Sequence, residues 1–210
     1  MKLERSFYIR DTIMVARELL GCILVRKTPE GITKGRIVEV EAYLGPEDKG
    51  AHSYLGRHTP TMDPLYKIGG FAHIFQLHGY NYCLNVVTQK QNMPQAVLIR
   101  GLEPYEGIEL MAKRRNIDLS NKNNSKLKNL TNGPSKLCQA FDIDTSINGI
   151  DLCGNELFIK SEKILNTNEE IVSTTRVNID YAEEFKYKPW RFLYKGNKFV
   201  SHGYKQKIGD

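Results

Sequence analysis

The sequence predicts an α+β fold, an antiparallel β-sheet core with flanking helices, in a single domain over residues 1–210. The chain is 210 residues long, which is enough to bury one hydrophobic core. Short strand-like segments are mixed with a few helical ones and lack the regular strand–helix alternation of a doubly wound sheet. No internal repeat or low-complexity linker divides the chain, which favours one domain over two.

The first predicted element is a helix over residues 10–21. Asp11 can cap its start, apolar residues recur at helical spacing, and Gly21 ends it. A strand over residues 22–27 follows, and a turn at residues 28–31 leads into a second strand. We therefore expect a helix packed against antiparallel strands.

The second strand, Gly35 to Leu44, combines a core-like pattern with two carboxylates. Because strand side chains alternate between two faces, one face is apolar and the other holds two acids and a tyrosine. The first face is Val38, Val40, Ala42 and Leu44, and the second is Ile37, Glu39, Glu41 and Tyr43. His52 follows a Gly-Pro-Glu-Asp turn, so a carboxylate, an aromatic ring and an imidazole can meet in one cleft. An exposed sheet edge with ordinary surface acids is the alternative.

The middle of the chain predicts a hairpin over residues 71–88. Two segments rich in aromatic and β-branched residues flank a polar break at residues 78–81, whose tip would carry exposed rings. A strand over residues 95–104 follows, and then a helix over residues 103–115 that becomes basic at its C-terminal end. Another helix should start at Gly133-Pro134, and short strands and helices complete the chain.

The charge distribution favours a polyanionic partner. The net charge is +6 and the pI is about 9.0. Residues 113–136 hold seven Lys or Arg residues against the single acid Asp118. This segment is either part of a nucleic-acid footprint or a solvated, asparagine-rich loop. Lys136, beside the predicted helix start, is the preferred ordered contact within it.

The cysteines and histidines indicate neither a disulfide scaffold nor a catalytic metal. The four cysteines are far apart and form no C-x-x-C pair, and the five histidines lack ligand spacing, so buried free thiols are expected. The cysteines are Cys22, Cys83, Cys138 and Cys153. No apolar run approaches the roughly 18 residues that span a bilayer, and the N-terminus lacks a signal-peptide core. We expect a soluble, cytoplasmic protein without a cofactor.

Four motifs, in order and with compatible spacing, together resemble the alkyladenine (3-methyladenine) DNA glycosylase family, and the similarity runs from about Asp11 to Ser201. They are GRIVEVEAYLGPEDKGAHS, VLIRGLEPYEG, NGPSKLCQAF and KPWRFLYKGN. The resemblance implies a mixed α/β domain like the C-terminal domain of formyltransferases, with a protruding β-hairpin that enters the DNA minor groove. It also implies a monomeric, monofunctional enzyme that flips alkylated or deaminated purines out of duplex DNA and hydrolyses the N-glycosidic bond.

The resemblance assigns roles residue by residue. Glu41 matches the general base that activates water, and Arg100 matches a residue that holds this water. Tyr43 and His52 match pocket residues that stack on the flipped base and contact its edge. Asn85 matches the asparagine that crowds out the amino group of guanine. The family gives Glu39 no catalytic role, so we expect a structural or pair-forming role for it.

The hairpin departs from the family pattern at three positions. His78 aligns with the tyrosine that fills the gap left by the flipped nucleotide, with Leu77 and Tyr80 as neighbouring candidates. Phe75 stands where the family has a second stacking tyrosine, and His73 stands at a commonly aromatic position. These departures favour one alternative, a non-catalytic lesion or nucleic-acid binder. A nucleoside or small-molecule glycoside hydrolase would share the carboxylate chemistry but would leave the basic segment and the hairpin unexplained.

Overall fold

The structure is a computed structural model that describes residues 1–120, 126–162 and 169–202. Its eight strands form one antiparallel sheet in the order β3-β4-β5-β2-β1-β6, and β8 pairs with both β2 and β7. This mixed α+β architecture confirms the predicted class. The strands are β1 (Ile23–Thr28), β2 (Gly31–Tyr43), β3 (Ala72–Gln76), β4 (Tyr82–Thr88), β5 (Gln95–Glu106), β6 (Leu157–Lys160), β7 (Ile171–Thr174) and β8 (Arg191–Tyr194).

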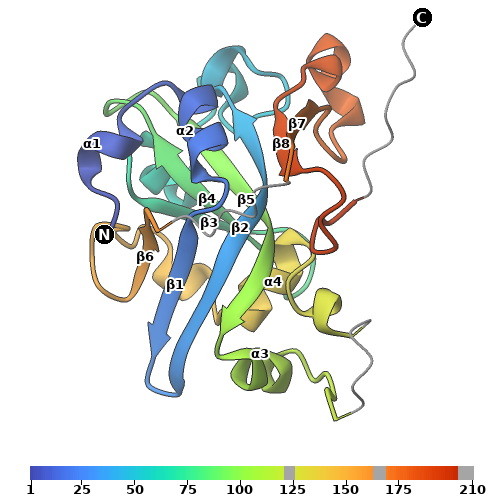
Figure 1. Cartoon of the computed structure of the whole chain (residues 1–210). Coiled ribbons are helices and arrows are strands. Elements are labelled where there is room, and N and C mark those ends of the chain that lie inside the picture. The colour runs from blue at the N-terminus through green and yellow to red at the C-terminus, as the bar shows by residue number, and fades with distance from the viewer. Residues whose placement is uncertain (121–125, 163–168, 203–210) are drawn as a thin grey trace, which may run out of the picture.

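In the part of the chain that the structure describes, four short α-helices and several 3₁₀ helices accompany the sheet. The α-helices are α1 (Arg5–Tyr8), α2 (Thr12–Leu19), α3 (Ile108–Arg114) and α4 (Pro134–Ala140). Asp11 caps α2 as predicted, since its carboxylate accepts a hydrogen bond from the Met14 amide. Helix α2 packs against β2 and β5, and β2 runs through the centre of the sheet (Figure 1).

Strand β2 is the central element because it pairs with three neighbours. Its first half pairs with β1, its second half with β8, and its other edge with β5 along most of its length. Register shifts between Ile37 and Val40 interrupt the simple alternation. Ile37 therefore packs in the main hydrophobic cluster with Val38 and Val40, which corrects its expected place beside the acids. Burial of the whole segment also excludes the exposed-edge alternative for Glu39 and Glu41.

The predicted helix over residues 103–115 begins later than expected. Strand β5 continues through Glu106, which pairs opposite Lys34, and α3 starts only at Ile108. Gly107 makes the turn between them at φ 78°, and a Cβ there would lie 2.3 Å from the Ile32 carbonyl oxygen. The predicted hairpin over residues 71–88 is confirmed as β3 and β4.

The cysteines are free thiols, and three of them are buried while Cys153 is half-buried. Within the described ranges, none of the helices has the length and apolar character needed to cross a membrane. The side chains described there also include no group of three or more His, Cys, Asp or Glu residues arranged to hold a metal ion. Lys122, in the basic segment, lies outside the described residues.

Candidate active site

A cavity of about 310 Å³ collects most of the residues that the sequence singled out. This volume is at the lower end of the range for small-molecule sites. Five predicted site residues line it together with the hairpin residue Leu77: Tyr43, His52, Phe75, Asn85 and Arg100. They come from the end of β2, the following loop, the β3–β4 hairpin and β5, so the fold brings segments distant in sequence to one place.

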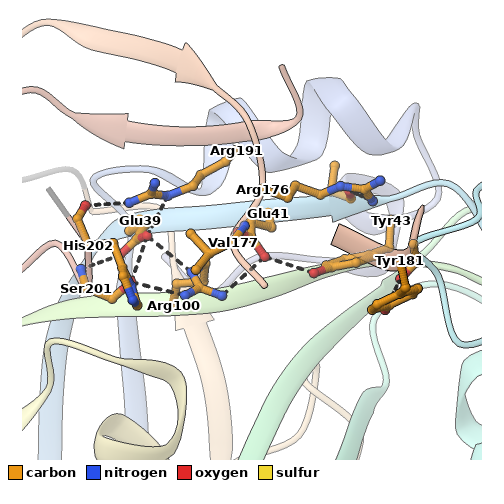
Figure 2. Close-up of polar contacts among 12 residues, drawn as sticks. Glu39, Glu41, Tyr43, Arg100, Arg176, Val177, Tyr181, Arg191, Ser201 and His202 are labelled. Atoms are coloured by element: carbon orange, nitrogen blue, oxygen red, sulfur yellow. Dashed lines mark hydrogen bonds and ion pairs between the residues drawn. The ribbon is translucent and has the colours of Figure 1, made fainter. Parts of the chain in front are cut away.

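Glu41 lies fully buried and is bonded to three cavity-lining residues (Figure 2). Its Oε2 accepts hydrogen bonds from the Tyr43 hydroxyl at 2.9 Å and from Arg100 at 3.2 Å, and its Oε1 accepts one from the Val177 amide at 2.7 Å. These donors fix the orientation of the carboxylate and replace water as its hydrogen-bond partners. Arg100 also contacts Glu39, and we call Glu39, Glu41, Tyr43 and Arg100 the carboxylate network.

The Tyr43 ring is held by a buried ion pair that sequence reasoning missed. Arg176 makes two hydrogen bonds to Asp48, at 2.6 and 2.8 Å, and donates another to the Ala42 carbonyl at 3.0 Å. Its guanidinium lies 4.6 Å from the centre of the Tyr43 ring. Burial and the Glu41 carboxylate raise the pKa of Tyr43, so its phenol remains a donor. In the sequence, Asp48 stands out only as part of a turn, and Arg176, which follows β7, belongs to no motif.

A second part of the cavity, the uncharged wall, consists of His52, His73, Phe75 and Asn85. The His52 and Phe75 ring centroids lie 4.3 Å apart with nearly perpendicular planes, and His73 stacks on Phe75 at 5.7 Å. The Asn85 side-chain nitrogen lies 3.2 Å from His73 Nδ1. This wall offers rings and one amide to a bound molecule.

Both histidines of the uncharged wall are neutral at pH 7. Burial, followed by the neighbouring His52, lowers the pKa of His73 to about 4. His52 keeps an exposed edge, yet burial of the rest of its ring, followed by the charge of Arg57, lowers its pKa as well. A flat base would therefore meet uncharged surfaces here.

The hairpin tip between β3 and β4 projects into solvent. Tyr80 is 90% exposed, Leu77 is 51% exposed, and His78 is also exposed. The turn is closed by local bonds, with the Leu77 amide donating to the Asn81 carbonyl and the Asn81 side chain donating to the His78 carbonyl, both at 2.7 Å. Of the three tip candidates, Leu77 lines the cavity.

The basic segment reaches the cavity through the start of α4. Pro134 and Ser135 line the cavity, and Lys136 follows them. The Lys136 ammonium donates to Asn132 at 2.9 Å. Partial burial and then the charges of Arg115 and Lys128 lower the pKa of Lys136. We call Lys126, Lys128 and Lys136 the basic cluster, and Lys136 places it beside the cavity.

The last third of the chain completes the site, and sequence reasoning assigned none of its residues. Val177, Tyr181 and His202 all line the cavity. Tyr181 lies near Tyr43 in Figure 2, and its hydroxyl donates to the Gly50 carbonyl at 3.3 Å. The sequence signal that could have indicated Tyr181 was an aromatic residue in the segment VNIDY, to which no role was assigned.

Comparisons with known proteins find relatives along nearly the whole chain. A family model described as methylpurine-DNA glycosylase matches residues 6–198. A Clostridium acetobutylicum protein is 54% identical, with 96% of this chain and 98% of that protein aligned. A protein of Desulfitobacterium hafniense strain Y51 is 49% identical over 95% of this chain and 98% of its own length. Both carry the name "Putative 3-methyladenine DNA glycosylase".

Proposed function

The chain belongs to the methylpurine-DNA glycosylase family, and from this premise we propose that it excises alkylated or deaminated purines from duplex DNA. The proposed substrates are 3-methyladenine, 7-methylguanine and hypoxanthine. The observation that carries the proposal is the buried Glu41 carboxylate, which is bonded to three residues on the wall of a cavity with aromatic sides.

The cavity suits a nucleotide that has left the duplex. A glycosylase cannot reach its target inside the base stack, so the nucleotide must rotate into a pocket. Tyr43, His52 and Phe75 would contact the base, and Asn85 would exclude the amino group of guanine. Alkylation makes the purine cationic, which strengthens its stacking on an electron-rich ring such as Tyr43. The exposed hairpin tip would fill the space left in the duplex.

The chemical step is hydrolysis with Glu41 as the general base. Glu41 would take a proton from a water that Arg100 helps to hold, and the water oxygen would bond to C1′ as the bond to the purine nitrogen breaks. The electron pair leaves with the purine, and the sugar becomes an abasic site. The carboxylate would also stabilise the oxocarbenium-like sugar. General-base catalysis of this kind contributes roughly 10²- to 10⁴-fold.

The nucleophile in this scheme is water, so we propose a monofunctional enzyme without abasic-site lyase activity. We further propose that the chain acts as a monomer on DNA in the cytoplasm, without a cofactor, and that residues 1–210 form one domain of the formyltransferase C-terminal type. A lyase would need an amine that forms a Schiff base with the sugar. Borohydride should therefore trap no covalent protein–DNA adduct during turnover.

The test is incubation with matched duplexes that carry a single hypoxanthine, a single 7-methylguanine or no lesion, followed by alkaline cleavage. We expect strand breaks at both lesions and none in the undamaged duplex. Lesion-specific binding without cleavage would favour the non-catalytic binder instead. Release of free base from nucleosides, with no action on duplexes, would favour a small-molecule hydrolase.

A further inference from the structure

Glu39 lies two residues before Glu41 on β2 and is equally buried, but the reaction above gives it no role. We propose that Glu39 is a positioning residue which, together with Ser201, fixes the Arg100 guanidinium against Glu41. This inference rests on the proposed function, because Arg100 is the residue through which Glu39 would affect the reaction.

The Glu39 carboxylate is fully committed to four hydrogen bonds. Its Oε1 accepts from Arg191 at 2.7 Å, from the Ser201 hydroxyl at 2.9 Å and from Arg100 Nε at 3.2 Å. Its Oε2 accepts from the Ser201 amide at 2.6 Å. A carboxylate with this many donors is held in one orientation. It is therefore a rigid anchor for the arginine beside it.

Arg100 uses all three guanidinium nitrogens within this cluster. Its Nε donates to Glu39, its Nη1 to Glu41 and its Nη2 to the Ser201 hydroxyl, each at 3.2 Å. Because the guanidinium is planar, bonds at Nε and Nη2 determine where Nη1 points. Glu39 and Ser201 thus fix both the plane and the position of the group that meets Glu41 (Figure 2).

The segment that supplies Ser201 is itself tied to the sheet. Arg191, which pairs with Glu39, also donates to the His202 carbonyl at 2.6 Å. It therefore holds the residue that follows Ser201. A Cβ on Gly101 would lie 2.7 Å from the Phe199 carbonyl oxygen, which leaves only glycine the room for this approach. The tail residues at 199–202 are therefore packed directly over β5, next to Arg100.

Charge balance explains why this anchor affects the reaction. Glu39 and Glu41 face two arginines, Arg100 and Arg191, and the four charges cancel. Without the Glu39 charge, Arg100 would turn toward Glu41 and form a closer pair with it. A closer pair would bind Glu41 Oε2, which already accepts from Arg100 and Tyr43, more tightly and make the carboxylate a poorer acceptor for the proton of water. Loss of Glu39 should therefore slow bond cleavage much more than it weakens DNA binding.

The test measures single-turnover base release from a hypoxanthine duplex and, separately, the Kd for that duplex. We expect Glu39→Gln to slow release about 10- to 100-fold, the scale expected when a reacting group is displaced by an ångström, with Kd nearly unchanged. Ser201→Ala should slow release by a smaller factor. Ser173→Ala is the matched control, because Ser173 is exposed on β7 and accepts a long 3.4 Å hydrogen bond from Arg17; its rate should equal that of the wild type.

The same substitutions in an Arg100→Gln background separate positioning from a general effect on the fold. If Glu39 and Ser201 act through Arg100, neither substitution should slow the Arg100→Gln protein further. Equal slowing in both backgrounds would overturn the inference, as would an unchanged rate in Ser201→Ala. If the Glu39→Gln protein does not fold, the rates of Ser201→Ala in the wild-type and Arg100→Gln backgrounds test the inference in the same way. A wild-type protein inactive on every lesion would instead refute the proposed function.

Discussion

The carboxylate network and the uncharged wall border the same cavity but treat charge in opposite ways. In the network, Glu41 has no exposed surface, and three hydrogen-bond donors replace the water that its carboxylate loses on burial. In the uncharged wall, His73 is buried almost as completely and has lost its charge, since burial lowers its pKa to about 4. Burial alone therefore does not decide the charge of a group here.

The difference follows from the number of partners that each group has. A buried charge is stable only when donors or opposite charges replace the water it loses. Glu41 has such donors, whereas the His73 ring contacts the neutral Asn85 amide. A fixed charge suits a reaction in which positive charge develops on the sugar, and a neutral surface suits a flat base. Changes in the network should therefore alter the rate, and changes in the wall should alter binding and pH dependence.

The largest effect is expected for Glu41→Gln, which keeps the shape of the side chain but removes the proton acceptor and the charge. Base release should fall by roughly 10²- to 10⁴-fold, while affinity for a hypoxanthine duplex stays within a few-fold of the wild type. Glu47→Gln is the matched control, since Glu47 is exposed on the 3₁₀ helix Gly45–Glu47. Near-normal base release by Glu41→Gln would show that the carboxylate network does not control the reaction rate.

The next effect concerns stability as the pH falls. The pKa of His73 is about 4 in the folded chain, against 6.5 for an ordinary histidine, so the unfolded chain binds the extra proton between these values. Stability should therefore be lost as the pH falls from 6.5 toward 4, by roughly 3 kcal/mol at most. His73→Gln should flatten this part of the curve.

Urea unfolding at a series of pH values between 4 and 7 measures the effect. His58→Gln is the control, because His58 is exposed and pairs with Asp63 outside the core. If His73→Gln and the wild type lose stability in parallel, His73 is not the group that titrates. In that case, the loss of stability would come from other groups, and the depressed pKa of His73 would lose its support.

The sequence alone predicted the parts of the site that depend on neighbours along the chain. Strand alternation put Glu41 and Tyr43 on one face, and the aromatic hairpin was readable from its composition. It did not reveal the anchors, because the Asp48–Arg176 pair joins residues 128 positions apart and the Glu39–Ser201 bonds join residues 162 apart. Contacts of this kind are set by packing of the whole sheet and leave no local periodicity.

The Tyr43 hydroxyl belongs to the carboxylate network, and the Tyr43 ring faces the cavity. Substitutions can therefore test the roles of the hydroxyl and of the ring separately. Tyr43→Leu should weaken capture of the lesion by about 1–3 kcal/mol, the usual value of base–aromatic stacking. Tyr43→Phe keeps the ring but loses the 2.9 Å bond to Glu41, so it should slow base release with little change in affinity. Binding and single-turnover assays on both variants check this. The reverse pattern would assign the ring to catalysis and the hydroxyl to binding.

The smallest effect should come from the basic cluster, which belongs to neither region. Lys126 and Lys128 are exposed, and Lys128 is close enough to Lys136 to lower the pKa of its ammonium. This cluster adjoins the cavity through α4, so we expect it to contact phosphates and not bases. Phosphate contacts position a protein on DNA without reading the sequence.

The double substitution Lys126→Gln/Lys128→Gln should therefore weaken binding to damaged and undamaged duplexes equally. Each lost phosphate contact should lower the slope of log affinity against log salt by about 0.9, because fewer counterions are released on binding. Lys27→Gln/Lys160→Gln is the matched control, since it removes the same charge from β1 and β6, at the sheet edge opposite β3. An equal loss of slope in both pairs would mean that only net charge matters. An unchanged slope in the first pair would make the segment a solvated loop, and DNA contact would then depend on Lys136 and the hairpin tip.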